Sequence, residues 1–145
     1  MVDGIVEALS EMGNVMVGDT ATFALPTLTH LRTPITVTPR RPASMDELVR
    51  AMHPTPALGG SPRDDAWKWL AARERARHRG RFGAPFGLEL GDAGATCVVA
   101  IRGLEWSSTH LRMGARCGVV AQSHVDLEWE ELQLKLACIR DTVGL

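Results

Sequence analysis

Residues 126–143 read DLEWEELQLKLACIRDTV, and their apolar side chains recur at steps of three and four positions. This spacing matches the period of an α-helix, so the apolar side chains would form one buried stripe. The stripe consists of Trp129, Leu132, Leu136, Ile139 and Val143. The sequence therefore predicts a closing helix from about residue 126 that packs by one side against the rest of the chain.

The polar side of this segment carries Glu128, Glu131 and Lys135, also at steps of three and four. A carboxylate and an ammonium therefore lie side by side on a face separate from the stripe. Two interpretations are open. In the first, the charges form a solvated ion pair that contributes a few tenths of a kcal/mol. In the second, Glu131 is an oxygen ligand for Mg²⁺ and Lys135 donates to an anionic substrate group.

Residues 81–121, which precede this helix, are punctuated by glycine. Runs 96–101 and 111–113 have the composition of strands, and residues 91–94 and 106–108 are typical of turns. We predict three antiparallel strands in a meander. Arg102 ends the first run, where it either reaches solvent or meets an anion, because burying an unpaired cation is costly.

Further towards the N-terminus, helical spacing predicts a first helix over residues 2–12 that ends at Gly13. The Thr-, Pro- and β-branched-rich composition of residues 13–41 favours extended structure and loops, with prolines restricting any strand to a sheet edge. We expect a single α+β domain over residues 1–145, with antiparallel strands packed against helices.

Two more helices are predicted between these regions. Ser44 and Glu47 form a capping box that starts a helix over residues 45–52. Residues 53–60 read as a loop. Ser61 as N-cap and Pro62 as the first helical residue then predict a helix that runs to about residue 77.

The composition excludes several classes of protein. The chain has 145 residues and a formal net charge of −1, which gives no general attraction to nucleic acid or to an anionic membrane. No apolar stretch approaches the ~18 residues that cross a bilayer, and the first residues do not resemble a signal peptide. We therefore expect a cytoplasmic protein with neither nucleic acid nor membrane as a partner.

Cysteine and histidine give weak signals. Cys97, Cys117 and Cys138 form no Cys-x-x-Cys pair, so we expect free thiols buried as small hydrophobic groups. His30 and His53 lie in Pro- and Thr-rich segments that either present an imidazole to a ligand or have no role. The arginine-rich run over residues 73–81 is explained mainly by favourable charge at a helix C-terminus.

Five segments resemble motifs of the chorismate-utilising enzymes: LTHLRTP over residues 28–34, HPTPALGG over 53–60, GRFGAPFG over 80–87, AIR over 100–102, and EWEE over 128–131 followed by Lys135. The 53–60 loop is similar to the isochorismate synthase version in particular, because anthranilate and aminodeoxychorismate synthases differ there. The segments follow family order at close to family spacing. The chain thus resembles the C-terminal part of an isochorismate synthase.

The resemblance implies an α+β sandwich whose large sheets enclose a core, with helices outside. It also implies that Arg102 and Lys135 bind chorismate carboxylate, that Glu131 ligates Mg²⁺, and that His30 and Ala57 line the ring pocket. The implied reaction converts chorismate to isochorismate, in menaquinone, siderophore or salicylate pathways. Water adds at one ring carbon while a hydroxyl leaves another, so a base and an acid are both needed.

The chain departs from the family pattern in two ways. The family's base lysine, its acid glutamate and its second metal-binding glutamate belong to upstream segments, so we assign no catalytic residue to these 145 residues. Arg116 also stands where the family has a glycine that lets the backbone approach the substrate. We expect the Arg116 side chain to obstruct chorismate.

Two functions are therefore open. The chain is either a chorismate-binding part of an isochorismate synthase, inactive without an N-terminal half, or a non-catalytic remnant that serves as a ligand-binding or interaction module. Part of a sandwich core would leave apolar surface uncovered. We therefore expect self-association or binding to an upstream half, and chorismate or a related small anionic molecule as the ligand.

Overall fold

The computed structural model describes residues 1–25, 29–73 and 79–145. They divide into two units, Met1–Ala72 with Glu89–Ala95 and Arg73–Leu88 with Thr96–Leu145. Helices and short antiparallel strand pairs occur together, which confirms the α+β class. The assignment of residues 1–145 to one domain stays a prediction. Within the described residues, no helix combines the length and the apolar character that spanning a membrane requires.

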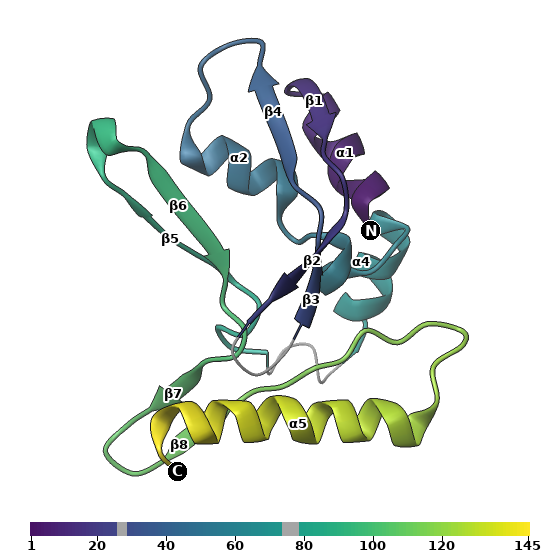
Figure 1. The fold of residues 1–145 in the computed structure, drawn as a ribbon, viewed down its shortest axis with the longest axis vertical. Coiled ribbons are helices and arrows are strands. Elements are labelled where there is room, and N and C mark those ends of the chain that lie inside the picture. Colours follow the sequence, from purple (N-terminus) through teal and green to yellow (C-terminus); the bar gives the residue numbers. More distant parts are fainter. Residues whose placement is uncertain (26–28, 74–78) are drawn as a thin grey trace. The chain divides into compact units, whose positions relative to one another are not determined.

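The first unit is built on a two-stranded ribbon (Figure 1). Strand β1 (Gly13–Val17) pairs with β4 (Ile35–Pro39), and β2 (Ala21–Ala24) pairs with β3 (Thr29–Arg32), both antiparallel. Between the two pairs, Gly18 N donates to the Pro34 carbonyl at 2.9 Å. Each of these strands has one neighbour, so the predicted restriction of the proline-rich segment to edge strands is confirmed.

Helix α1 (Val2–Ser10) contacts β1 and β4 and buries Leu9 against them. Its C-terminal carbonyls would lack partners inside the helix, but the Arg40 guanidinium donates to Glu11 O at 2.9 Å and to Ser10 O at 3.3 Å. The predicted first helix is confirmed, but its predicted end is wrong: the helix ends at Ser10, and Gly13 is the first residue of β1.

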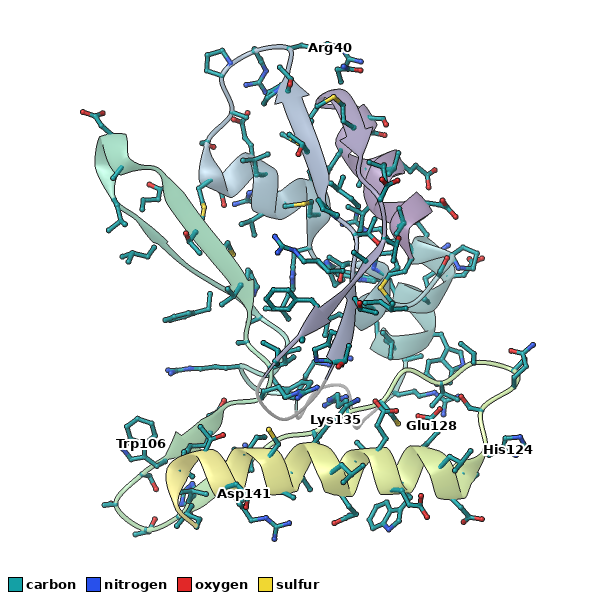
Figure 2. The ribbon with its side chains drawn as sticks, in the orientation of Figure 1. Arg40, Trp106, His124, Glu128, Lys135 and Asp141 are labelled. Carbon is teal, nitrogen blue, oxygen red and sulfur yellow. The ribbon has the colours of Figure 1, made fainter. Side chains whose placement is uncertain are left out.

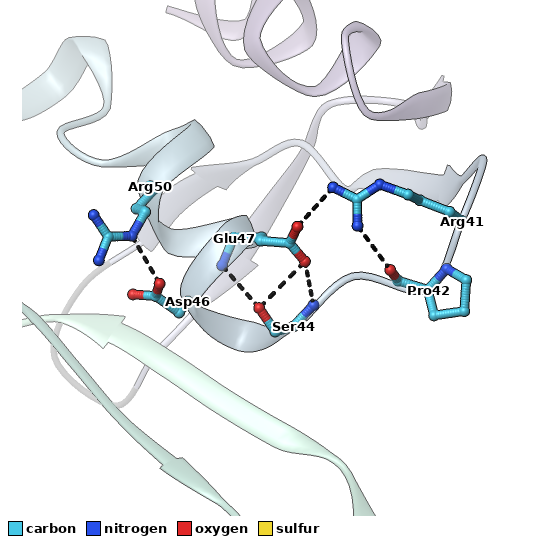
Figure 3. Close-up of polar contacts among 6 residues, drawn as sticks. All are labelled: Arg41, Pro42, Ser44, Asp46, Glu47 and Arg50. Atoms are coloured by element: carbon cyan, nitrogen blue, oxygen red, sulfur yellow. Dashed lines mark hydrogen bonds and ion pairs between the residues drawn. The ribbon is translucent and has the colours of Figure 1, made fainter.

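Helix α2 (Met45–Met52) has the predicted bounds and the predicted capping box (Figure 3). Glu47 N donates to Ser44 Oγ at 3.2 Å, and Ser44 N donates back to Glu47 Oε2 at 2.9 Å. Arg41 Nη2 donates to Glu47 Oε1 at 2.6 Å, and this guanidinium lowers the pKa of Glu47 to about 2.

Two expectations for the next segment are wrong. The 53–60 loop contains one helical turn, α3 (Pro56–Gly59), which starts at a proline whose missing N–H costs nothing in a first turn. The following helix, α4 (Arg63–Ala71), has Pro62 as its N-cap, and Ser61 supplies no cap. Instead, the Arg63 guanidinium donates to the carbonyls of Ala51 and His53 at 3.3 and 3.0 Å. Residues 74–78 of the predicted helix lie outside the described residues.

In the remainder of the described chain, four strands form two separate pairs, so the predicted three-stranded meander is wrong. Strand β5 (Pro85–Glu89) pairs with β6 (Ala95–Val99) across the short 3₁₀ helix η2 (Gly91–Ala93). Strand β7 (Leu104–Trp106) pairs with β8 (Leu111–Met113). Between the pairs, Arg102 has φ 56°, a left-handed conformation that is incompatible with a continuous strand from β6 to β7.

Helix α5 (Val125–Val143) confirms the closing helix, but its apolar stripe is covered unevenly. Ile139 is 5% exposed, whereas Trp129 is 61% and Val143 is 43% exposed. The prediction of one buried stripe is therefore wrong at its two ends, because no described element covers them. Leu9 and Ile139 are the buried apolar side chains of the described residues.

The three cysteines are free thiols, as expected, but they are not uniformly buried. Cys97 is exposed, and Cys117 and Cys138 are half-buried. The expectation of a buried group is wrong for Cys97 because β6 has a single partner strand and its side chains remain open to solvent.

Candidate functional site

Lys135 is held at the centre of a polar cluster on α5. Its ammonium forms an ion pair with Glu131, one helical turn earlier, and donates to the carbonyl oxygen of Arg116 at 3.0 Å. The Lys135 side chain is only 21% exposed. An ammonium has three N–H donors, so one remains for a ligand after these two contacts.

Glu128 extends this cluster by another helical turn, and Figure 2 shows it on the same side of α5 as Lys135. Glu128 Oε1 accepts from Ser123 Oγ at 2.6 Å, and this hydrogen bond lowers the pKa of Glu128. Glu128 Oε2 is buried and has no hydrogen-bond partner. The neighbouring Cys117 thiol is only a weak donor to this carboxylate and lowers its pKa slightly further. A buried carboxylate oxygen without a strong donor is costly, so Oε2 is available to a cation or to a donor that binds there.

Cys117 borders the same cluster from the segment that carries Arg116. Burial raises the pKa of the Cys117 thiol, and the neighbouring Glu128 carboxylate raises it further. The thiol therefore remains protonated near neutral pH and acts as a weak donor rather than as a nucleophile.

The Mg²⁺ that the family resemblance implies fits this donor set. Glu131 and Glu128 present hard carboxylate oxygens on successive turns of one helix, and one of those oxygens is buried and unpaired. The described residues contain no group of three or more His, Cys, Asp or Glu side chains arranged to hold a metal. Two carboxylates are sufficient in principle, because Mg²⁺ is usually held by one or two carboxylates together with waters and substrate oxygens.

The other predicted site residues belong to elements other than α5. Arg102 is exposed in the connection between β6 and β7, and in the described part of the chain no hydrogen bond or ion pair joins it to Lys135. His30 is exposed on β3, opposite Phe23, and Ala57 is exposed in α3. His30 and Ala57 belong to the first unit, and Arg102, Glu131 and Lys135 belong to the second.

The expectation of a loop position is wrong for His30, which is a residue of strand β3. It is confirmed for His53, which follows α2 as its C-cap and whose backbone N–H donates to Val49 O at 2.7 Å. Of the arginine-rich run, residues 74–78 lie outside the described residues, as do residues 26–28 at the edge of the 28–34 motif.

A shallow pocket of about 140 Å³ lies on the β7–β8 hairpin, lined by Glu105, Trp106, Ser107, His110 and Arg112. Ser107 Oγ and His110 Nδ1 are 3.0 Å apart there. Ser107 Oγ also accepts from the N–H groups of Thr109 and His110, both at 3.2 Å. These bonds fold the turn, so the Ser–His contact is part of the hairpin structure.

Sequence reasoning placed Glu128 on the shared face but gave it no role in the site, and it missed the contact of the Arg116 backbone with Lys135. The spacing of Glu128, Glu131 and Lys135 was the available signal for a shared face. The unpaired Glu128 oxygen and the contact between Lys135 and Arg116 depend on a segment 19 residues away in the sequence.

Comparison with known proteins identifies one family for this chain. The family model described as "Chorismate binding enzyme" matches residues 1–144. No solved structure matches the chain.

The similar curated proteins are isochorismate synthases. The chain is 40% identical over 116 residues to isochorismate synthase MenF of Bacillus subtilis, covering 79% of this chain and 24% of that protein. It is 33% identical over 115 residues to the salicylate biosynthesis isochorismate synthase of Pseudomonas aeruginosa, covering 79% and 24%. It is 32% identical over 120 residues to isochorismate synthase EntC of Escherichia coli, covering 83% and 30%.

The chain therefore spans about a quarter to a third of the length of these three relatives. The family match itself extends over nearly all of the 145 residues and includes the α5 cluster. The chain belongs to the chorismate binding enzyme family.

Proposed function

We propose that this chain is the chorismate-binding C-terminal part of an isochorismate synthase, and that Lys135 is its central anion-binding group. The observation that carries the proposal is the fixed ammonium of Lys135. Glu131 and the Arg116 carbonyl hold it in place, and one donor remains for a carboxylate. A charge-assisted hydrogen bond to a substrate carboxylate is about twice as strong as a neutral one.

Charge balance supports a role for Mg²⁺ at the same place. Glu128, Glu131 and Lys135 together carry one net negative charge, which would repel a dicarboxylate such as chorismate. We propose that Glu131, with Glu128, holds Mg²⁺, which when bound would neutralise carboxylate charge. Arg102 would then bind a carboxylate with its guanidinium fork, and His30 and Ala57 would line the ring pocket.

The test is direct binding of chorismate, measured by isothermal titration calorimetry with and without Mg²⁺. Lys135→Ala should weaken binding at least ~10-fold, because a charged hydrogen bond contributes about 1.5–3 kcal/mol. Glu131→Gln should remove the dependence of binding on Mg²⁺. The matched controls are Lys68→Ala and Glu130→Gln, which change exposed residues of the same types. Equal effects of the site variants and their controls would refute the proposal.

We also propose that the 145 residues alone do not convert chorismate to isochorismate. The family's base and acid have no counterpart among the matched motifs, and each such group typically contributes ~10²–10⁴-fold to the rate. Incubation with chorismate and Mg²⁺, followed by chromatography, should show no isochorismate. Turnover that persists after repurification and disappears in Glu131→Gln would contradict this expectation.

Exposed apolar side chains favour a further polypeptide as a partner. Phe86 and Leu88 on β5 are 71% and 60% exposed, and Val98 on β6 is 54% exposed. Exposed apolar surface of this kind usually marks an interaction site. We propose that an upstream half or a second copy covers it. A compact monomer in analytical ultracentrifugation at tens of micromolar, with no binding of an apolar dye, would exclude both.

A further inference from the structure

Two arginines of the second unit have no anionic partner. Arg79 has a buried Nε–H without a hydrogen-bond acceptor. The Arg116 guanidinium stacks on the Phe82 ring, with its Cζ 5.2 Å from the ring centroid. Within residues 79–145, neither side chain takes part in a hydrogen bond or an ion pair with a carboxylate.

Phe82 brings the two arginines together. Its backbone N–H donates to Arg79 O at 3.1 Å, its ring lies close to Gly114, and the guanidinium of Arg116 lies over the ring. A Cβ at Gly114 would be 2.8 Å from Cδ2 of Phe82, so the small residue is what admits the ring. Arg116 thus makes a cation–π contact with the Phe82 ring, close to Arg79.

This arrangement is unfavourable as it stands. Burial lowers the pKa of Arg116, and the positive charge of Arg79 lowers it further, which shows that the two cations repel each other. Arg116 is exposed and Arg79 is half-buried, with its Nε buried. Two neighbouring cations without a counter-ion repel each other, and an anion between them would remove the repulsion and supply acceptors. Guanidinium groups are also the side chains best suited to bind a carboxylate in two-pronged fashion.

We propose that Arg79 and Arg116 form an anion subsite that binds a carboxylate group of a small-molecule ligand. The subsite adjoins the α5 cluster, because the Arg116 carbonyl accepts the hydrogen bond from Lys135 at 3.0 Å. A ligand with two carboxylates can therefore place one at Lys135 and the other on the arginine pair. The identification of that ligand as chorismate rests on the proposed function, whereas the subsite itself does not.

The subsite and the obstruction expected from the sequence predict opposite results for one substitution. If Arg116 binds the ligand, Arg116→Gln weakens binding. If Arg116 blocks the space left by a family glycine, Arg116→Gln or Arg116→Gly strengthens chorismate binding. The sign of the change in affinity distinguishes the two.

The experiment uses ¹⁵N NMR of the arginine Nε–Hε groups during titration with malonate and, separately, with chorismate and Mg²⁺. The resonances lost in Arg79→Gln and Arg116→Gln identify the two side chains. In the unmodified chain, both should shift saturably. Either substitution should weaken malonate binding at least ~10-fold, as expected for loss of a charged hydrogen bond. Arg140→Gln, which changes an exposed arginine of α5, is the matched control and should have no effect.

Arg116→Lys keeps the charge but loses the planar fork, so it should give intermediate affinity while preserving the fold. The subsite would be overturned if the Nε–Hε resonances shifted linearly with malonate concentration, or if the Arg140 resonance shifted as much as those of Arg79 and Arg116. Tighter chorismate binding by Arg116→Gln would also overturn it. Saturable malonate binding without chorismate binding would support the subsite and refute the proposed function. Chorismate binding that depends on Lys135 but on neither arginine would support the proposed function and refute the subsite.

Discussion

The N-terminal end of α2 and the polar face of α5 use charged side chains in opposite ways. At α2, Glu47 is bonded by Ser44 and Arg41, and Arg50 donates to Asp46 at 2.7 Å (Figure 3). On α5, Lys135 retains a free donor, Glu128 Oε2 has no partner, and Arg116 has no counter-ion. Complete local bonding stabilises a fold, whereas unused bonding capacity next to buried charge is what a ligand site requires.

The ion pairs Arg41–Glu47 and Glu131–Lys135 differ in the same way as the two helices. The Arg41–Glu47 pair joins residues six apart, and its side chains are 72% and 39% exposed. The Glu131–Lys135 pair also lies on a helix surface, but its lysine is anchored to a backbone carbonyl from a distant segment. The first pair is complete in the folded chain, whereas the second leaves a donor for a bound anion.

The largest effect is expected at Gly13, at the start of the β1–β4 ladder. A Cβ there would lie 2.7 Å from the Thr38 carbonyl carbon and would overlap its oxygen, so the paired backbone would have to move. Gly13→Ala should lower the free energy of unfolding by about 3 kcal/mol, as overpacking against rigid atoms does. The control is Gly18→Ala, whose Cβ would make an ordinary 3.5 Å contact with Pro34. Equal urea midpoints for the two variants would show that β1 does not require this close approach.

A smaller effect is expected at the N-cap of α2. Ser44→Ala should destabilise the chain by about 1 kcal/mol, because the Glu47 N–H loses its acceptor. Ser61→Ala is the informative control, because the sequence predicts Ser61 as the N-cap of α4, whereas Pro62 is the N-cap in the structure. Thermal and urea unfolding should therefore leave Ser61→Ala unchanged. Destabilisation by both variants would mean that Ser61 is also a cap.

The contribution of Glu47 should depend on pH. Its pKa in the folded chain is about 2, below the ordinary value of 4.5, so the charged form is favoured by folding. The stability that it adds is complete above pH ~4.5 and disappears as the pH falls towards 2. The difference in stability between the unmodified chain and Glu47→Gln should follow that window in acid titrations monitored by circular dichroism. A difference in stability that does not vary with pH would show that the contact with Arg41 does not stabilise the charged form of Glu47.

The smallest change in stability is expected on the α5 face. Glu131 is 51% exposed, and an exposed pair one helical turn apart contributes about 0.2–0.5 kcal/mol. Glu131→Gln should therefore change the unfolding free energy by no more than that, although under the proposed function it should remove the Mg²⁺ dependence of ligand binding. A loss of several kcal/mol would assign Glu131 to the fold instead of the site.

Much of the local structure could be predicted from sequence. The capping box at Ser44 and the period of residues 126–143 specify helices because the interacting groups are three or four residues apart. The pairing of the strands could not be predicted from the sequence. A left-handed backbone at Arg102 separates β7 from β6, and no residue pattern distinguishes that turn from the continuous meander that was expected.

For the site, the sequence by itself determined the family, the helix and the shared face of Glu128, Glu131 and Lys135. Only the tertiary structure decided that Lys135 is anchored to the Arg116 carbonyl, that Glu128 Oε2 is buried without a partner, and that Arg116 stacks on Phe82. The physical reason is the separation in sequence over which each kind of interaction acts. Helical spacing positions neighbours within a turn or two, whereas burial and partnership across 19 residues or more depend on how separate segments pack.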